Sequence, residues 1–148
     1  MYRRSDPNFT EGFFFDAGKK QLLESTGLYG ESYAQWTDLD HDVGTAAPSD
    51  IKVPFADDIH GAGISNLTDS TVIMLTWREN KVMTLDRDTL KIVSEIPLWE
   101  GVEEGRGITL DPEKRILYVS DGSGTITCVN ADTLALERQF KVQNSILE

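Results

Sequence analysis

The sequence repeats itself with an offset of 44 residues, and this repeat limits the possible folds more than any other feature. Apolar residues, glycines and turn residues recur at matching positions in the two copies. A fainter copy precedes them, with Gly12 and the apolar pair Leu22-Leu23 at the corresponding places. The stretches that align without a gap are 63–65 with 107–109, 72–76 with 116–120, and 88–90 with 132–134. A period in this range indicates a fold built from stacked copies of one small unit.

Within each copy, the pattern is typical of short strands joined by tight turns. In the clearest copy, β-branched and apolar residues predict strands over Thr71–Trp77, Lys81–Asp86 and Lys91–Ile96. Four short strands in about 40 to 45 residues make one blade of a β-propeller. A sandwich or barrel of ordinary hairpins is the alternative, but those folds do not require turn residues at a constant spacing. The sequence therefore predicts an all-β fold, an incomplete β-propeller of about three four-stranded blades.

The repeat divides the chain into a short tail and a partial propeller. We expect a tail over residues 1–8, blades over about 9–56, 57–100 and 101–142, and the start of a further blade at 143–148. A closed propeller ring usually needs four or more blades. An arc of three blades would expose unpaired sheet faces. We therefore expect a protein partner or self-association to cover the open edges of the arc.

The charge of the chain excludes some classes of partner. The 14 Lys and Arg residues are outnumbered by 25 Asp and Glu residues, which gives a net charge of −11. This field repels the phosphates of nucleic acids and of anionic membranes. No apolar run approaches the roughly 18 to 20 residues of a membrane helix, and the first residues lack the apolar stretch of a signal peptide. We expect no nucleic-acid binding and no membrane insertion, and the compartment stays open.

Sites in propellers usually lie at one mouth of the central channel, where the blades contribute equivalent positions. Here the residues that close the second strand of each unit include Glu24, Trp77 and Asp121. Two carboxylates and an indole at one mouth would suit a cationic or amide-bearing ligand. The alternative is that the carboxylates only cap their turns.

Several short motifs follow one another in a fixed order. They are Phe9-Thr10-Glu11-Gly12, Glu24-Ser25-Thr26-Gly27-Leu28-Tyr29-Gly30, Leu75-Thr76-Trp77, Asp86-Arg87-Asp88-Thr89-Leu90 and Ser120-Asp121-Gly122-Ser123. In this order and spacing they resemble the glutaminyl-peptide cyclotransferases of the plant and bacterial type. The heptad that begins at Glu24 is the most specific motif. The resemblance extends from about residue 7 to the C-terminus and implies a five-bladed propeller.

The resemblance implies a reaction and roles for particular residues. The substrate would be a peptide with an N-terminal glutamine, whose α-amine attacks its own side-chain amide, so that ammonia leaves and pyroglutamate forms. This chemistry needs no redox or phosphate cofactor and no metal. It needs a carboxyl group that takes a proton from the amine and returns one to the leaving nitrogen. The resemblance assigns that role to Glu24, makes Trp77 a wall of the substrate pocket, and places the Phe9 ring near the substrate.

The chain also departs from the family pattern at several pocket positions. Glu11 stands where the family usually has glutamine, which adds a second carboxylate near the site. His60-Gly61-Ala62-Gly63 replaces Phe-Gly-Glu-Gly, Arg106 replaces a tryptophan, and Ser145 replaces a substrate-binding asparagine. We take Glu11 and Ser145 as further candidates for contact with the substrate. Two hypotheses follow: a glutaminyl-peptide cyclotransferase, or a catalytically degenerate propeller that serves as a scaffold or binding subunit of a larger assembly.

Overall fold

The computed structural model describes residues 9–38 and 51–142, which form twelve strands. Blade 1 contains β1 (Thr10–Asp16), β2 (Gln21–Thr26), β3 (Tyr33–Asp38) and β4 (Ile51–Pro54). Blade 2 contains β5 (Gly61–Asn66), β6 (Thr71–Thr76), β7 (Lys81–Asp86) and β8 (Ile92–Pro97). Blade 3 contains β9 (Ile108–Asp111), β10 (Ile116–Ser120), β11 (Thr125–Asn130) and β12 (Leu136–Lys141). Each blade is one antiparallel sheet whose strands pair in chain order.

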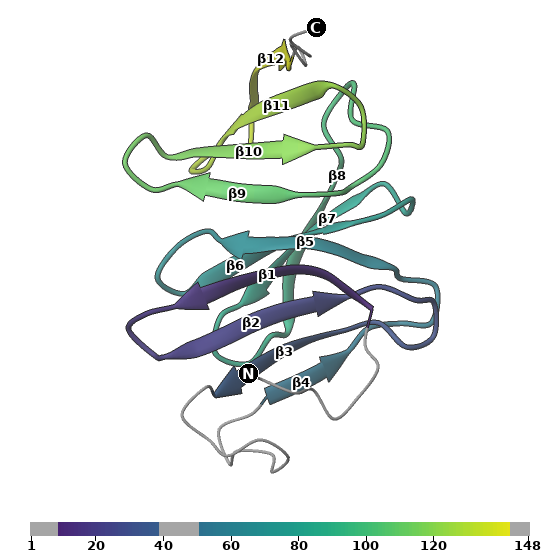
Figure 1. Cartoon of the computed structure of the whole chain (residues 1–148), viewed down its shortest axis with the longest axis vertical. Coiled ribbons are helices and arrows are strands. Elements are labelled where there is room, and N and C mark those ends of the chain that lie inside the picture. The colour runs from purple at the N-terminus through teal and green to yellow at the C-terminus, as the bar shows by residue number, and fades with distance from the viewer. Residues whose placement is uncertain (1–8, 39–50, 143–148) are drawn as a thin grey trace, which may run out of the picture.

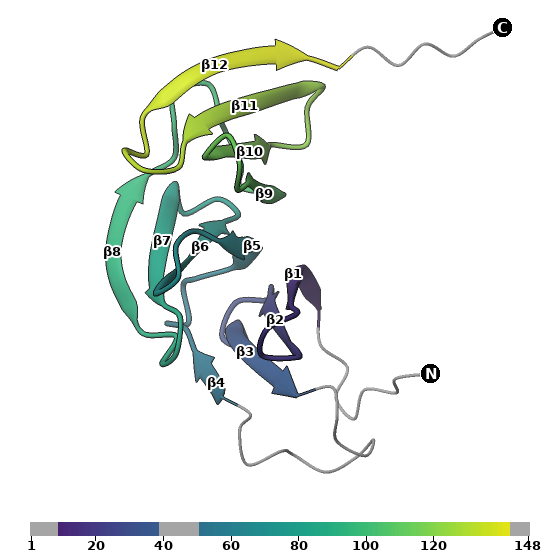
Figure 2. The same cartoon turned by 90° about the vertical axis from the view of Figure 1, so that its left-hand side faces the viewer.

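The three sheets are stacked face to face, with blade 2 in the middle (Figure 1). Figure 2 shows that they fan out as an arc, in which β4, β8 and β12 lie along the outside. The innermost strands meet at the other side, where β5 contacts both β1 and β9. This arrangement confirms the expected incomplete β-propeller, and residues 143–148, expected to begin a further blade, lie outside the described residues.

Glycines recur on the inner strands because the backbones there approach very closely. The Gly63 N–H donates to the Arg106 carbonyl oxygen over 2.7 Å. A Cβ atom on Gly63 would lie 2.5 Å from that oxygen, and one on Gly12 would lie 2.6 Å from the Ile64 nitrogen. No side chain fits in these spaces, so only glycine lets the blades converge on the channel.

The ungapped alignment of 72–76 with 116–120 is wrong by one residue in the structure. Val72 pairs with Leu85, and the equivalent residue of blade 3, Leu117, pairs with Val129. The offset between equivalent residues is therefore 44 from β7 to β11 but 45 from β6 to β10. Compared with blade 2, blade 3 has one more residue in the connection between its first two strands, β9 and β10. It has one residue fewer in the connection between β10 and β11. Because neighbouring residues of a strand point to opposite faces, Leu117 rather than Ile116 faces blade 2.

Two apolar cores hold the arc together, one at each boundary between blades. The first joins Leu23 and Trp36 of blade 1 to blade 2, and the second joins blade 2 to Leu117 and Val129 of blade 3. Blade 2 is therefore buried on both faces, whereas among the described strands blades 1 and 3 each present one face without a neighbouring sheet. Burying apolar surface contributes roughly 25 cal/mol per Å², so both cores stabilise the arc.

We call the uncovered face of blade 1 the outer face. Its residues share the side of the sheet opposite Leu23, because they alternate with the core positions along their strands. They are Phe13, Phe15, Leu22, Glu24 and Gln35. Phe13 and Phe15 are 67% and 53% exposed, respectively. These two rings form an exposed apolar patch on blade 1.

A partly buried ion pair also links blades 1 and 2. The Asp16 carboxylate lies 2.5 Å from the Arg87 guanidinium, and each side chain is 12% exposed. The same guanidinium donates to the Asn66 amide oxygen and lies over the rings of Phe14 and Trp36. Arg87 thus joins polar and aromatic contacts from both blades.

Substitution of Arg87 by methionine is expected to lower the free energy of unfolding by about 2 to 3 kcal/mol, because it leaves the partly buried Asp16 carboxylate without its charged donor. Urea unfolding at pH 7 measures the change. Lys81→Gln is the control, since its ion pair with Glu95 is largely exposed, and it should change the free energy by less than about 0.5 kcal/mol. Equal effects of the two substitutions would contradict the role of Arg87.

The same pair predicts a dependence of stability on pH. Burial raises the pKa of Asp16, but the Arg87 guanidinium and the backbone N–H groups of Lys19 and Gly18 outweigh burial and bring the pKa below its ordinary 3.8. A carboxyl whose pKa is lowered by folding stabilises the protein above its unfolded pKa, and this contribution is lost as the pH falls through the folded value. The difference in unfolding free energy between the wild type and Asp16→Asn should therefore be constant above about pH 5 and shrink below pH 4. Urea unfolding between pH 3 and pH 7 tests this, and a constant difference would contradict it.

Candidate functional site

Glu24 lies in β2 on the outer face of blade 1, opposite Phe13 and Gln35. The residue is only 2% exposed. The Thr10 hydroxyl donates to the Glu24 carboxylate over 2.5 Å, which fixes the orientation of one oxygen. Phe9 precedes β1 and is exposed, and its carbonyl accepts the Gly27 N–H over 2.9 Å. The start of β1 and the end of β2 therefore hold a buried carboxyl beside a hydroxyl, with the exposed Phe9 preceding β1.

Glu11 points away from Glu24, toward blade 2. The pairing of β1 with β2 shifts between Thr10 and Gly12, so Glu11 occupies a β-bulge. Bulges re-aim side chains, and this one brings the Glu11 carboxylate to 3.3 Å from Nε2 of His60. The contact crosses the boundary between blades 1 and 2.

His60 connects blade 1, blade 2 and the heptad. Its Nδ1 accepts the Leu28 N–H over 3.3 Å. Its ring packs edge-on against Tyr29, with centroids 5.4 Å apart, and is tilted against Trp77, with centroids 5.0 Å apart. A Cβ atom on Gly27 would lie 2.1 Å from Nε2 of His60, so the heptad glycine makes the space for the imidazole.

Trp77 follows β6 and is engaged on several sides by residues of this chain. Its backbone N–H donates to the His60 carbonyl over 3.0 Å, and its indole N–H donates to Glu104 over 3.0 Å. The Arg78 guanidinium lies 4.0 Å and the Arg106 guanidinium 5.5 Å from the ring centroid. The indole N–H, and then the guanidinium groups of Arg78 and Arg106, hold the pKa of Glu104 below its usual range.

Tyr29 completes this group of residues. Its hydroxyl donates to Glu79 over 2.6 Å, and this bond raises the pKa of the phenol above its ordinary value. The other Glu79 oxygen lies 3.4 Å from the His60 backbone nitrogen. We call the connected set the rim cluster; its members are Glu11, Tyr29, His60, Trp77, Glu79 and Glu104.

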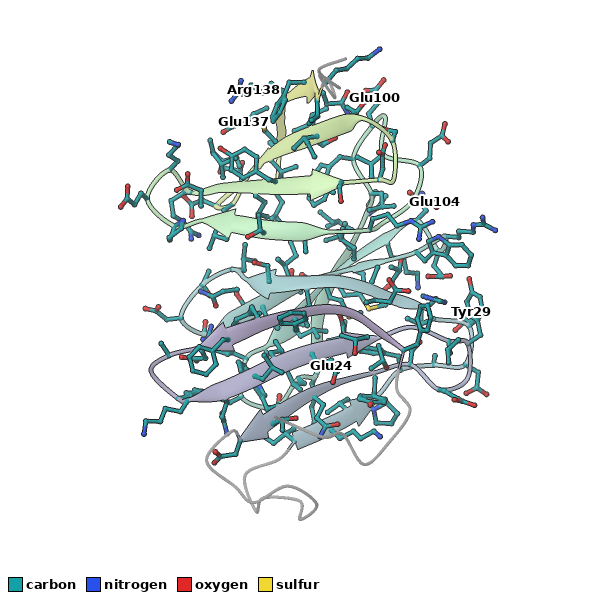
Figure 3. The ribbon with its side chains drawn as sticks, in the orientation of Figure 1. Glu24, Tyr29, Glu100, Glu104, Glu137 and Arg138 are labelled. Atoms are coloured by element: carbon teal, nitrogen blue, oxygen red, sulfur yellow. The ribbon has the colours of Figure 1, made fainter. Side chains whose placement is uncertain are left out.

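The residues expected at one mouth have different immediate surroundings. Trp77 belongs to the rim cluster, whereas Glu24 lies on the outer face of blade 1. In Figure 3, Tyr29 and Glu104 lie toward one edge of the stacked blades and Glu24 lies farther in. Asp121 accepts hydrogen bonds from the Ser123 backbone and hydroxyl, which is the turn-capping role. Ser145 lies outside the described residues.

Sequence reasoning did not single out His60, Tyr29 or Glu104 as interacting residues. His60 was visible only as a departure from a motif, and Glu104 lies in a glycine-flanked acidic loop that is typical of a connection between repeats. Their partners are distant in sequence, as in the Glu11–His60 contact across 49 positions. No local pattern could have indicated these pairs.

The described residues contain no group of three or more histidine, cysteine or acidic side chains arranged to hold a metal ion. Within the same part of the chain, no helix is long and apolar enough to span a membrane. Cys128 is buried and its thiol is not in a disulfide.

Comparisons with known proteins agree with this architecture. A glutaminyl-peptide cyclotransferase of Arabidopsis thaliana is 29% identical over 130 residues, which are 87% of this chain and 37% of the plant protein. The crystal structure of Myxococcus xanthus glutaminyl cyclase superposes with a TM-score of 0.73 at 20% identity, over 96% of this chain and 54% of that one. A chain of a nidogen/laminin complex superposes with a TM-score of 0.65 at 18% identity, over 88% of this chain and 47% of that one.

This chain thus spans between about a third and a little over a half of the proteins that it resembles. The two structural likenesses are below 25% identity and by themselves show only the fold. The decisive comparison is the family model for glutamine cyclotransferase, which matches residues 2–147. The chain belongs to the glutamine cyclotransferase family and forms an incomplete β-propeller of that type.

Proposed function

We propose that this chain supplies the acid–base carboxyl of a glutaminyl-peptide cyclotransferase, which converts an N-terminal glutamine to pyroglutamate with release of ammonia. One observation carries the proposal. The glutamate that opens the family heptad, Glu24, is a buried carboxyl oriented by the Thr10 hydroxyl.

The proposed reaction is a ring closure within one substrate. The α-amine nitrogen attacks the side-chain amide carbon, a C–N bond forms, and the bond to the amide nitrogen breaks. Glu24 takes a proton from the attacking amine and gives a proton to the departing nitrogen, so it ends in its starting state. Holding the substrate bent converts the attack into a favourable intramolecular step, so a shaped pocket supplies much of the rate.

Glu24 lies on the outer face of blade 1, which no other described sheet covers. We propose that a further four-stranded blade packs over Phe13 and Phe15 and closes the pocket next to the buried Glu24. The exposed rings support this proposal. The matched cyclase of Myxococcus xanthus has further chain beyond the 54% that this chain covers. The covering blade would come from a longer polypeptide, from a partner protein or from self-association.

The alternative function is a catalytically degenerate scaffold or binding subunit, and the surroundings of Trp77 favour it. The residue expected to wall a substrate pocket instead donates its indole N–H to Glu104 and lies beneath Arg78. Arg106, which replaces a family tryptophan, pairs with Glu104 over 2.7 Å. In this alternative, the same outer face binds another blade but no glutaminyl peptide.

Ammonia release from a peptide with an N-terminal glutamine tests the two functions. The matched control is the same peptide with an acetylated α-amine, which cannot attack its own side chain. The cyclotransferase proposal expects ammonia from the free peptide only. The scaffold alternative expects no ammonia and no binding of either peptide, even with the outer face covered.

A further inference from the structure

We propose that His60 is a positioning residue for Glu24, and that it acts as a neutral imidazole whose proton is on Nε2. In this role it bonds to the two chain segments that flank the Glu24–Thr10 contact. The inference deepens the proposed function and rests on it for its catalytic meaning. Its structural content concerns only the hydrogen bonds of His60 and can be tested without any activity.

The two ring nitrogens of His60 face groups with opposite hydrogen-bonding roles. Nδ1 lies 3.3 Å from the Leu28 backbone nitrogen, which can only donate. Nε2 lies 3.3 Å from a Glu11 carboxylate oxygen, which accepts when ionised. The arrangement that satisfies both contacts has an unprotonated Nδ1 and a proton on Nε2. A doubly protonated ring would lose the Leu28 contact, and the other neutral form would lose both.

Two backbone features on blade 1 make room for this arrangement. The β-bulge at Glu11 takes that side chain out of the regular alternation of β1 and turns it toward blade 2. Gly27 leaves the space that the imidazole occupies, since any Cβ atom there would overlap Nε2. The bulge and the glycine lie on different segments, and both are needed for one contact.

The anchored segments adjoin the candidate acid–base group on both sides. Glu11 follows Thr10, whose hydroxyl orients the Glu24 carboxylate. Leu28 lies just beyond the end of β2, the strand that carries Glu24. His60 therefore ties the Thr10 segment and the Glu24 segment to the same edge of blade 2. Rigid support of this kind determines how well a catalytic group is held in a productive geometry.

The tautomer is tested directly by nitrogen NMR of the full chain labelled with ¹⁵N-histidine at pH 8. The chain has two histidines, and the spectrum of His60→Phe identifies the signals of His60. We expect an unprotonated Nδ1 and a protonated Nε2. A proton on Nδ1, or on both nitrogens, would overturn the inference. The same shifts can be read in the solid state if the chain self-associates.

A double-mutant cycle tests the positioning role. The single variants are Glu11→Ala, which removes the acceptor, and His60→Phe, which removes the donor; the third variant combines them. If the pair acts as a unit, the combined loss in kcat/KM for ammonia release should be smaller than the product of the single losses, by a factor of about three to ten. The folded-to-unfolded ratio in urea should show coupling of the same sign. Additive effects in both measurements would overturn the role of the pair.

The control cycle combines His60→Phe with Glu95→Gln on the exposed strand β8, and its effects should multiply without coupling. The design separates the two proposals. If the wild-type chain releases no ammonia, the proposed function fails, but the tautomer and the coupling in urea still decide the structural inference. If it releases ammonia while the His60 ring has the other tautomer, only the positioning inference fails.

Discussion

Replacement of Glu24 by glutamine should lower kcat/KM for ammonia release from a glutaminyl peptide by about 100-fold or more. Glutamine keeps the size of the side chain and can still accept the bond from the Thr10 hydroxyl, but it cannot carry a proton from the amine to the leaving nitrogen. The measurement compares initial rates of ammonia release, at equal protein concentration, under conditions in which the wild type is active.

Glu95→Gln is the matched control, because it makes the same chemical change on the exposed strand β8 and should leave the rate unchanged. Urea unfolding of both variants shows whether Glu24→Gln still folds. If the folded Glu24→Gln variant keeps its activity, Glu24 is not the acid–base group.

Replacement of Gly63 by alanine should lower the free energy of unfolding by about 3 kcal/mol, the upper end of the usual range for overpacking. The new methyl group would lie 2.5 Å from the backbone oxygen of Arg106, at the point where the inner strands of blades 2 and 3 are hydrogen bonded. A backbone oxygen cannot move aside as a flexible side chain can, so the two blades would have to separate. Urea unfolding, with the change in m-value checked, measures the cost.

Gly124→Ala is the control for a glycine substitution of the same size. The nearest atom to its new methyl group would be a carbonyl oxygen at 3.6 Å, an ordinary contact. We expect a change within about 0.5 kcal/mol. Similar costs at Gly63 and Gly124 would contradict the close approach of the inner strands as the reason for the repeated glycine.

The fold was predictable because each copy of the repeat encodes its own strands and turns. The alternation that marks strands and the turn residues that end them are local, and three copies reinforce the same interpretation. The one-residue shift of β10 was hidden for a related reason. Blade 3 has one extra residue before Ile116 and one residue fewer after Ser120, so its length matches that of blade 2. The 44-residue offset therefore holds both before and after β10.

The candidate site was predictable only in part. The motifs singled out Glu24, Trp77 and Glu11, but they could not indicate which side of blade 1 each residue would face. The β-bulge sends Glu11 toward His60, whereas Thr10, the residue before it, bonds to Glu24 on the outer face. Thr10 and Glu11 are neighbours in the sequence, but the bulge places their side chains in different environments. The rim cluster depends on contacts between blades, which no local pattern records.

The most direct test of the covered outer face and of Glu24 as the acid–base group is to separate the purified chain by size, measure the molar mass of each fraction by light scattering, and assay each fraction for ammonia release from a glutaminyl peptide. We predict that activity coincides with a complex heavier than the 16.5 kDa chain, in which another blade covers the outer face, and that Glu24→Gln removes this activity. Full activity in the fraction of monomer mass, or activity that survives Glu24→Gln in any fraction, would contradict it.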